Sequence, residues 1–245
     1  MKSDDYTYVV SCGGYGSSEI RLLSGFDDEA LISNVVYKAP REYFFEGCAL
    51  LPGDRLVVLT WRNKKILEFH STSFQLIREV DYPYDGWGLT FDPAHNELVA
   101  TDGSDRMFFL EPSTLSVTRS CQVRLTHNGK SYISVRYMNE LEYMHGLIYA
   151  NIYIPAGVKG APNFIVGINP DSCIVEKILP FSITAGSPGN VEHVMNGIAE
   201  WGSDSSRFLV SGKMWNKIYL VTETRESPSL AHNITKFLAH DLYFR

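Results

Sequence analysis

A unit that recurs along the chain limits the folds open to it. Each copy has a turn bearing Gly or Asn, a short apolar strand, a second turn and a second apolar strand. The four openings of this unit are Phe45–Leu50, Gly86–Phe91, Asn139–Tyr143 and Asn196–Trp201. Successive openings lie 41, 52 and 57 positions apart, counted from Gly47, Gly88, Glu140 and Gly197. This period is typical of four-stranded propeller blades.

The second half of the unit repeats as well. Three segments share an apolar strand, a turn with Ser, Pro or Asp, and a further strand: Ile66–Phe74, Met107–Leu115 and Phe164–Cys173. These turn residues are typical of hairpins between antiparallel strands. Partial copies at Tyr15–Leu23 and Lys217–Val221 bring the count to five units. The sequence therefore predicts an all-β, five-bladed β-propeller that forms one domain over residues 1–245.

Both ends of this repeat are irregular. One strand, Tyr6–Val10, precedes Gly13, and no turn-and-strand opening comes before it. We therefore expect the first blade to be incomplete at the amino end. Residues 223–245 follow the last unit as a tail. Within the tail, Asn233–Tyr243 is predicted to form a short helix or an added strand, with Asn233 as a helix N-cap.

Composition excludes several classes of partner. The net charge is −6, and no basic stripe of the kind that binds nucleic acid is present. No run of 18 apolar residues exists to span a membrane. Met1–Asp5 lacks the apolar region of a signal peptide, so the chain shows no export signal of its own.

The cysteines and histidines do not indicate a metal site. Cys12, Cys48, Cys121 and Cys173 have no CxxC spacing, and each falls in or beside an expected strand. We expect them to be buried free thiols. The seven histidines show neither HxH nor HExxH spacing, which gives no support to a zinc hydrolase. Asp102–Asp105 is predicted to be a solvated hairpin turn, since it offers few ligands for calcium.

In a propeller the first strand of each blade faces the axis, so residues that open the units converge although they are far apart in sequence. The residues at these openings are Glu46, Trp87, Asn139, Glu140 and Asn196. Those that follow the second strands are Trp61, Tyr153 and Lys213–Trp215. Aromatic rings beside a carboxylate, an amide and an ammonium group indicate a pocket for a small ligand.

Eight of these segments, in this order, resemble the motif series of the plant and bacterial type of glutaminyl-peptide cyclotransferase. The segments are Phe44–Gly47, Leu59–Trp61, Asp85–Thr90, Thr101–Ser104, Asn139–Tyr143, Ile148–Asn151, Asn196–Ala199 and Ser211–Trp215. The resemblance extends over residues 13 to 221. It implies a five-bladed propeller that converts the N-terminal Gln of peptides or proteins into pyroglutamate, releases ammonia, and uses neither a metal nor another cofactor.

The resemblance also assigns roles to individual residues. It places the catalytic carboxylate on Glu46 and its polar partners on Asn139 and Lys213. The substrate-binding aromatic residues fall on Phe44, Trp61, Trp87 and Tyr153. Relatives usually have Trp at the position of Tyr153, and the Phe-Thr-Gln-Gly-like motif that opens the family's first blade has no counterpart in this chain.

The chemistry of this reaction suits these residue types. The α-amine of the substrate attacks its own γ-carboxamide, so the protein mainly has to hold the folded conformer. The amine has an ordinary pKa of about 7.7 to 8.0 and must be neutral to attack. Glu46 can accept its proton and return one to the departing ammonia. Lys213 and Asn139 can stabilise the oxyanion, and Trp61 and Trp87 can offer ring faces to the ammonium.

Other interpretations remain open at this stage. A propeller with an incomplete first blade can keep the pocket and act as a peptide-binding scaffold. A calcium-dependent lactonase-like propeller would need more carboxylates on the axis than Glu46 and Glu140 provide. Glu140 and Glu142 are expected to bind strand amides, and Trp201 and Trp215 to pack between blades. We expect a monomer whose partners are Gln-initiated peptides, and only the resemblance suggests a secretory or extracellular location.

Overall fold

The computed structural model describes residues 7–26, 31–127, 131–154, 163–181, 194–202 and 206–223. These residues form strands and turns and include no helix that could cross a membrane. They divide into two compact units. The first unit comprises Met1–Ala100 with Leu110–Val117, and the second comprises Thr101–Phe109 with Thr118–Arg245. The segment Asn233–Tyr243, for which we predicted a helix or strand, lies outside the described residues.

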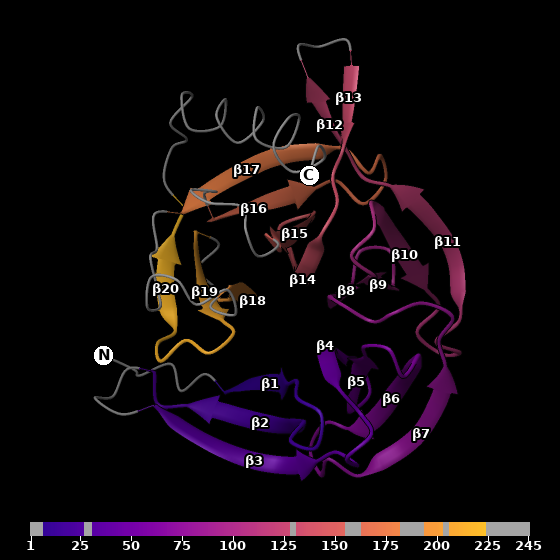
Figure 1. Cartoon of the computed structure of the whole chain (residues 1–245), viewed down its shortest axis with the longest axis vertical. Coiled ribbons are helices and arrows are strands. Elements are labelled where there is room, and N and C mark those ends of the chain that lie inside the picture. Colours follow the sequence, from indigo (N-terminus) through magenta and orange to yellow (C-terminus); the bar gives the residue numbers. More distant parts are fainter. Residues whose placement is uncertain are drawn as a thin grey trace. The chain divides into compact units, whose positions relative to one another are not determined.

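Five antiparallel sheets of three or four strands, and one two-stranded hairpin, follow one another along the described part of the chain (Figure 1). The strands of the first two sheets are β1 (Tyr8–Cys12), β2 (Glu19–Ser24) and β3 (Ile32–Lys38), then β4 (Phe45–Leu51), β5 (Arg55–Thr60), β6 (Lys65–His70) and β7 (Leu76–Asp81). The third sheet has β8 (Leu89–Asp92), β9 (Glu97–Thr101), β10 (Arg106–Leu110) and β11 (Val117–Gln122). A hairpin of β12 (Arg124–His127) and β13 (Ser131–Ser134) follows. The fourth sheet has β14 (Met138–Met144), β15 (Leu147–Ile152), β16 (Asn163–Ile168) and β17 (Val175–Phe181). The fifth sheet has β18 (Met195–Glu200), β19 (Arg207–Gly212) and β20 (Tyr219–Thr222).

The strands of each sheet are joined in sequence order, as in propeller blades. The middle strands are the most apolar, because both of their faces are covered. In β5 and β15 nearly every residue is buried, whereas the outer strands β3 and β7 are largely exposed. The first sheet has three described strands, and every residue of β1 is only half-buried. The prediction that the first repeat lacks an opening strand also concerns residues 1–6, which lie outside the described part of the chain.

Close backbone contact explains the recurring glycines of the repeat. The amide of Gly47 in β4 donates to the carbonyl of Trp87, just before β8, at 2.7 Å. A Cβ atom on Gly47 would lie 2.4 Å from the backbone nitrogen of Leu89 and 2.6 Å from the Trp87 oxygen. A Cβ atom on Gly86 would likewise lie 2.5 Å from the Thr60 carbonyl oxygen. Only glycine fits here, so the glycines set the spacing between the first strands of the second and third sheets.

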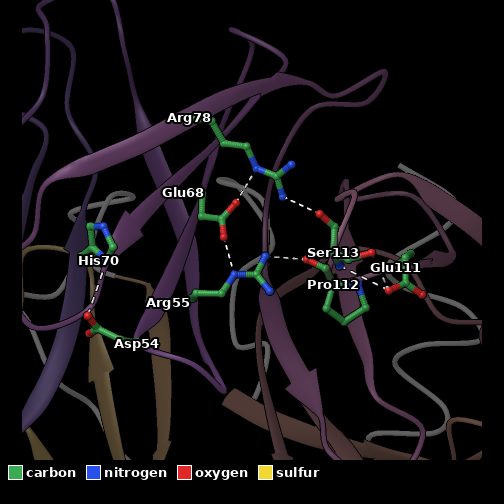
Figure 2. A network of polar contacts seen from close by, with 8 residues as sticks. All are labelled: Asp54, Arg55, Glu68, His70, Arg78, Glu111, Pro112 and Ser113. Atoms are coloured by element: carbon green, nitrogen blue, oxygen red, sulfur yellow. Dashed lines mark hydrogen bonds and ion pairs between the residues drawn. The ribbon is translucent and has the colours of Figure 1, made fainter.

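Two arginines that share a buried carboxylate join the second sheet to the turn between β10 and β11 (Figure 2). Glu68 in β6 accepts hydrogen bonds from Arg55 in β5 and from Arg78 in β7. Both arginines also donate to backbone carbonyls, Arg55 to Pro112 at 2.6 Å and Arg78 to Ser113 at 2.6 Å. Burial would raise the pKa of Glu68, but the hydrogen bonds and charges of the two arginines outweigh it and lower that pKa.

Replacing Glu68 with Ala is expected to lower the free energy of unfolding by about 2 to 3 kcal/mol. The change leaves two guanidinium groups without their shared carboxylate, and the loss is moderated because both remain partly exposed to water. Urea unfolding measures the effect. Asp81→Ala is the control, because this carboxylate is 92% exposed and its ion pair with Lys65 contributes little. Equal losses in the two variants would contradict the role given to Glu68.

The prediction of four free thiols is wrong for two of them. Cys121 in β11 and Cys173, in the turn before β17, form a disulfide with their Cα atoms 6.4 Å apart. Cys12 and Cys48 are free, as predicted, although both are half-buried. The paired cysteines are 52 positions apart and lie in successive sheets. Their proximity results from the packing of one sheet against the next, which spacing along the chain does not reveal.

Candidate functional site

A β-bulge positions the predicted catalytic carboxylate. In the pairing of β4 with β5, Phe45 lies opposite Thr60 and Cys48 lies opposite Val58. The strand β4 therefore has one extra residue, within Glu46–Gly47. Bulges are frequent beside active sites, because they redirect a side chain at the end of a strand. Glu46 is half-buried, and its own carbonyl accepts a hydrogen bond from the Ser11 hydroxyl.

The same irregularity occurs at the openings of the fourth and fifth sheets. In β14 the register shifts between Met138 and Leu141, which places Asn139 and Glu140 in the bulge. In β18 it shifts between Met195 and Gly197, with Asn196 as the extra residue. Glu46, Asn139 and Asn196 thus occupy equivalent positions in three sheets. Trp87 precedes Gly88 as Glu46 precedes Gly47, although β8 begins only at Leu89.

A second set of predicted residues follows the second strand of each sheet. The backbone amides of Trp61, Tyr153 and Lys213 donate to the carbonyls of Phe44, Tyr137 and Val194 at 2.9, 2.8 and 2.8 Å. Each bond lies one residue beyond the ladder of the first two strands. The predicted residues of the second, fourth and fifth sheets therefore fall on two equivalent structural positions, the bulge and the first residues beyond the ladder.

Within the first compact unit, the structure brings Phe44 and Trp61 together. Their ring centroids are 5.4 Å apart in an edge-to-face arrangement. Tyr15 adds a third ring, 5.2 Å from Phe44 and 6.4 Å from Trp61. The guanidinium of Arg62 lies 4.2 Å from the centroid of the Trp61 ring. The protein thus supplies its own cation to Trp61, one of the two rings that we expected to meet the substrate ammonium.

Within the second compact unit, hydrogen bonds between amide side chains and the neighbouring strand hold Asn139. Its Nδ2 donates to Oδ1 of Asn196 at 2.5 Å, and the Asn139 residue is only 7% exposed. The fully buried Asn151 connects the same two strands. Its Oδ1 accepts from the Glu140 amide at 2.9 Å, and its Nδ2 donates to the Met195 carbonyl at 2.6 Å. Hydrogen bonding therefore fixes the Asn139 side chain in one orientation.

Lys213 is carried by a tight turn at the end of β19. The amide of Trp215 donates to the Gly212 carbonyl at 3.2 Å, and Met214 has a positive φ of 60°. The Trp215 ring packs directly on Gly212, where a Cβ atom would lie 2.2 Å from it. The Lys213 side chain is exposed. The turn thus holds the backbone of Lys213 at the surface of the second compact unit.

Glu142 has the structural role that we predicted for it. Its carboxylate accepts the backbone amide of Glu200 in β18 at 3.0 Å. Burial raises the pKa of Glu142 to about 7, although this hydrogen bond acts in the opposite direction. Trp201 is buried and Trp215 packs against the apolar core of the second unit, which confirms their assignment to packing.

Two residues of interest received no role from the sequence. Asn196 was placed at an opening, and the likeness of Asn196–Ile198 to Asn139–Leu141 is the signal that could have linked it to Asn139. Tyr15 gave no such signal, because its contacts depend on how a turn folds against a neighbouring strand. Among the described residues, no group of three or more His, Cys, Asp or Glu side chains could hold a metal ion.

Comparison with known proteins identifies the family. A family model described as glutamine cyclotransferase matches residues 1–222. A glutaminyl-peptide cyclotransferase of Arabidopsis thaliana is 31% identical over 220 residues, which are 88% of this chain and 63% of that protein. The crystal structure of Myxococcus xanthus glutaminyl cyclase superposes with a TM-score of 0.64 at 26% identity, covering 90% of this chain and 93% of that one. The predicted all-β, five-bladed propeller fold is thereby confirmed, and the chain belongs to the glutamine cyclotransferase family.

Proposed function

We propose that this chain is a glutaminyl-peptide cyclotransferase, which converts an N-terminal Gln of peptides or proteins into pyroglutamate and releases ammonia. Family membership and the names of the two relatives support the proposal. The chain spans 63% of the length of the Arabidopsis relative, so the activity needs a test on this chain itself. One observation carries the proposal furthest: residues that the family resemblance selects occupy equivalent positions in several sheets.

Glu46 is the proton carrier in this proposal. Its bulge lies at the opening of β4, where Glu46 is half-buried and follows Phe44 by two residues. The carboxylate binds the substrate ammonium, accepts one proton to free the amine for attack, and then protonates the leaving ammonia. The family resemblance assigns substrate binding to Phe44, Trp61, Trp87 and Tyr153, and aromatic rings that contact the Gln side chain favour its folded conformer.

Asn139 and Lys213 stabilise the negative charge that develops on the carboxamide oxygen. The amide nitrogen of Asn139 carries two hydrogens, of which one is donated to Asn196. The second can donate to the oxyanion in a fixed direction, so no reorganisation is needed during the reaction. The exposed ammonium of Lys213 adds a full positive charge.

We further propose that the reaction is metal-independent and that the chain acts as a monomer. The residues assigned to chemistry comprise one carboxylate, one amide and one ammonium group, which is a poor set of metal ligands. Ammonia release from a Gln-initiated peptide should therefore proceed unchanged after dialysis against a chelator. Loss of activity that calcium restores would instead favour the lactonase-like alternative, and peptide binding without ammonia release would favour the scaffold alternative.

Replacing Asn196 with Ala is expected to lower kcat about tenfold with a smaller change in KM. The variant removes the acceptor that orients Asn139, so the oxyanion donor is retained but loses its fixed direction. Asn196→Asp keeps an acceptor oxygen and should recover most of the rate. Asn34→Ala, at an exposed position of β3, is the control. Equal rates for Asn196→Ala and Asn34→Ala would contradict this role.

A further inference from the structure

Tyr15 is an exposed tyrosine whose ring lies beside two other aromatic rings. It lies between β1 and β2, and the residue is 55% exposed. Its ring contacts the edge of Phe44, with centroids 5.2 Å apart, and stands 6.4 Å from Trp61. We call these three residues the aromatic shelf. Phe44 and Trp61 are half-buried, so Tyr15 is its outermost and most accessible member.

The turn that carries Tyr15 is firmly held. The Ser18 hydroxyl accepts from the Gly14 amide at 3.0 Å and from the Phe45 amide at 3.1 Å, which ties the turn to β4. The Gly16 amide donates to the Arg41 carbonyl at 3.0 Å. The Tyr15 ring is therefore presented from a rigid backbone, and little entropy is lost when a ligand contacts it.

Glycine permits this close approach. A Cβ atom on Gly13 would lie 2.4 Å from the Phe44 ring and 2.4 Å from the Phe45 carbonyl oxygen. The turn therefore packs directly against the residues that precede Glu46. A substrate whose terminal Gln contacted Phe44 and Trp61 would have the accessible Tyr15 ring as a neighbour.

We infer that Tyr15 is a specificity-determining residue that contacts the side chain following the terminal Gln. The inference rests on the proposed cyclase function. The ring centroids of Phe44 and Tyr15 are 5.2 Å apart, which is less than the length of two residues of an extended peptide at about 3.3 to 3.6 Å per residue. The second side chain thus reaches Tyr15 once the Gln occupies the inner part of the shelf. An exposed ring on a rigid backbone favours an aromatic partner, through stacked or edge-to-face contact.

The neighbouring charge adds a second preference. Arg62 is exposed, and its guanidinium lies over Trp61, the ring next to Tyr15. A cationic side chain at the second position of the substrate would meet this fixed positive charge. The preferred order of second residues is therefore aromatic, then alanine, then lysine.

The test compares kcat/KM for the peptides Gln-Phe-Ala, Gln-Ala-Ala and Gln-Lys-Ala. The natural chain should favour Phe over Ala by about 3- to 10-fold, the range of one aromatic pair. Tyr15→Ala should abolish this preference while it still cyclises Gln-Ala-Ala, and Tyr15→Phe should retain it. Tyr132→Ala is the matched control, because Tyr132 is 59% exposed, much like Tyr15, and does not belong to the aromatic shelf.

The outcomes separate the inference from the function on which it rests. An unchanged Phe-to-Ala ratio in Tyr15→Ala, with all three peptides cyclised, would overturn the inference and leave the cyclase function intact. An equal loss of rate on every peptide would show that Tyr15 is only structural and would also overturn it. Absence of ammonia release from all peptides by the natural chain would remove the proposed function and the inference together.

Discussion

Glu46→Gln is expected to lower kcat/KM for a Gln-initiated peptide about 1000-fold, equivalent to about 4 kcal/mol of barrier. The glutamine keeps the shape of the side chain but can neither accept the amine proton nor deliver one to ammonia. Because it is nearly isosteric, the variant should fold normally and unfold at the same urea concentration as the natural chain. Ammonia release under single-turnover conditions measures the chemical step directly.

Glu140→Gln is the matched control for this experiment. Glu140 lies in the equivalent bulge of β14, and its backbone amide is bonded to Asn151. A carboxylate in this position that does not transfer protons can be replaced with little loss of activity. The assignment of the proton carrier would be wrong if Glu140→Gln abolished activity and Glu46→Gln retained it.

Loss of the Cys121–Cys173 disulfide is expected to have the largest effect on stability. The bond closes a segment of 52 positions, for which the chain-entropy estimate is roughly 4 kcal/mol. Urea unfolding with and without a reductant measures this contribution. The Cys121→Ser, Cys173→Ser double variant should match the reduced natural chain and should not respond to reductant. A natural chain whose stability is the same under both conditions would contradict the stabilising role of the bond.

The period of the repeat was sufficient to predict the fold, because the turns and apolar strands that define each repeat are visible in the sequence. Gly47 and Gly86 are required where the second and third sheets touch, and a turn bearing Gly or Asn recurs at the openings of the repeat. The bulges were not predicted. An extra residue such as Asn196 leaves the apolar pattern of its strand almost unchanged, and it becomes visible only in the register with the partner strand.

The candidate site could be predicted only in part for a similar reason. The types and positions of Glu46 and Asn139 are visible in the sequence, because they recur at the same point of the unit. The contacts around the site are not visible in the sequence. Asn139 contacts Asn196, 57 positions away, and Tyr15 contacts Phe44, which follows it in the chain after two intervening strands. Such contacts depend on packing between sheets. The same cause explains why Cys121 and Cys173 were wrongly predicted to be free.

The most direct test of the proposed function is the intact mass of a short Gln-initiated peptide after incubation with this chain. The account predicts a product lighter by one ammonia molecule, and no change in the same peptide when its N-terminus is acetylated, because the acetylated amine cannot attack. An unchanged Gln-initiated peptide, at a protein concentration where the Myxococcus xanthus enzyme completes the conversion, would contradict the account.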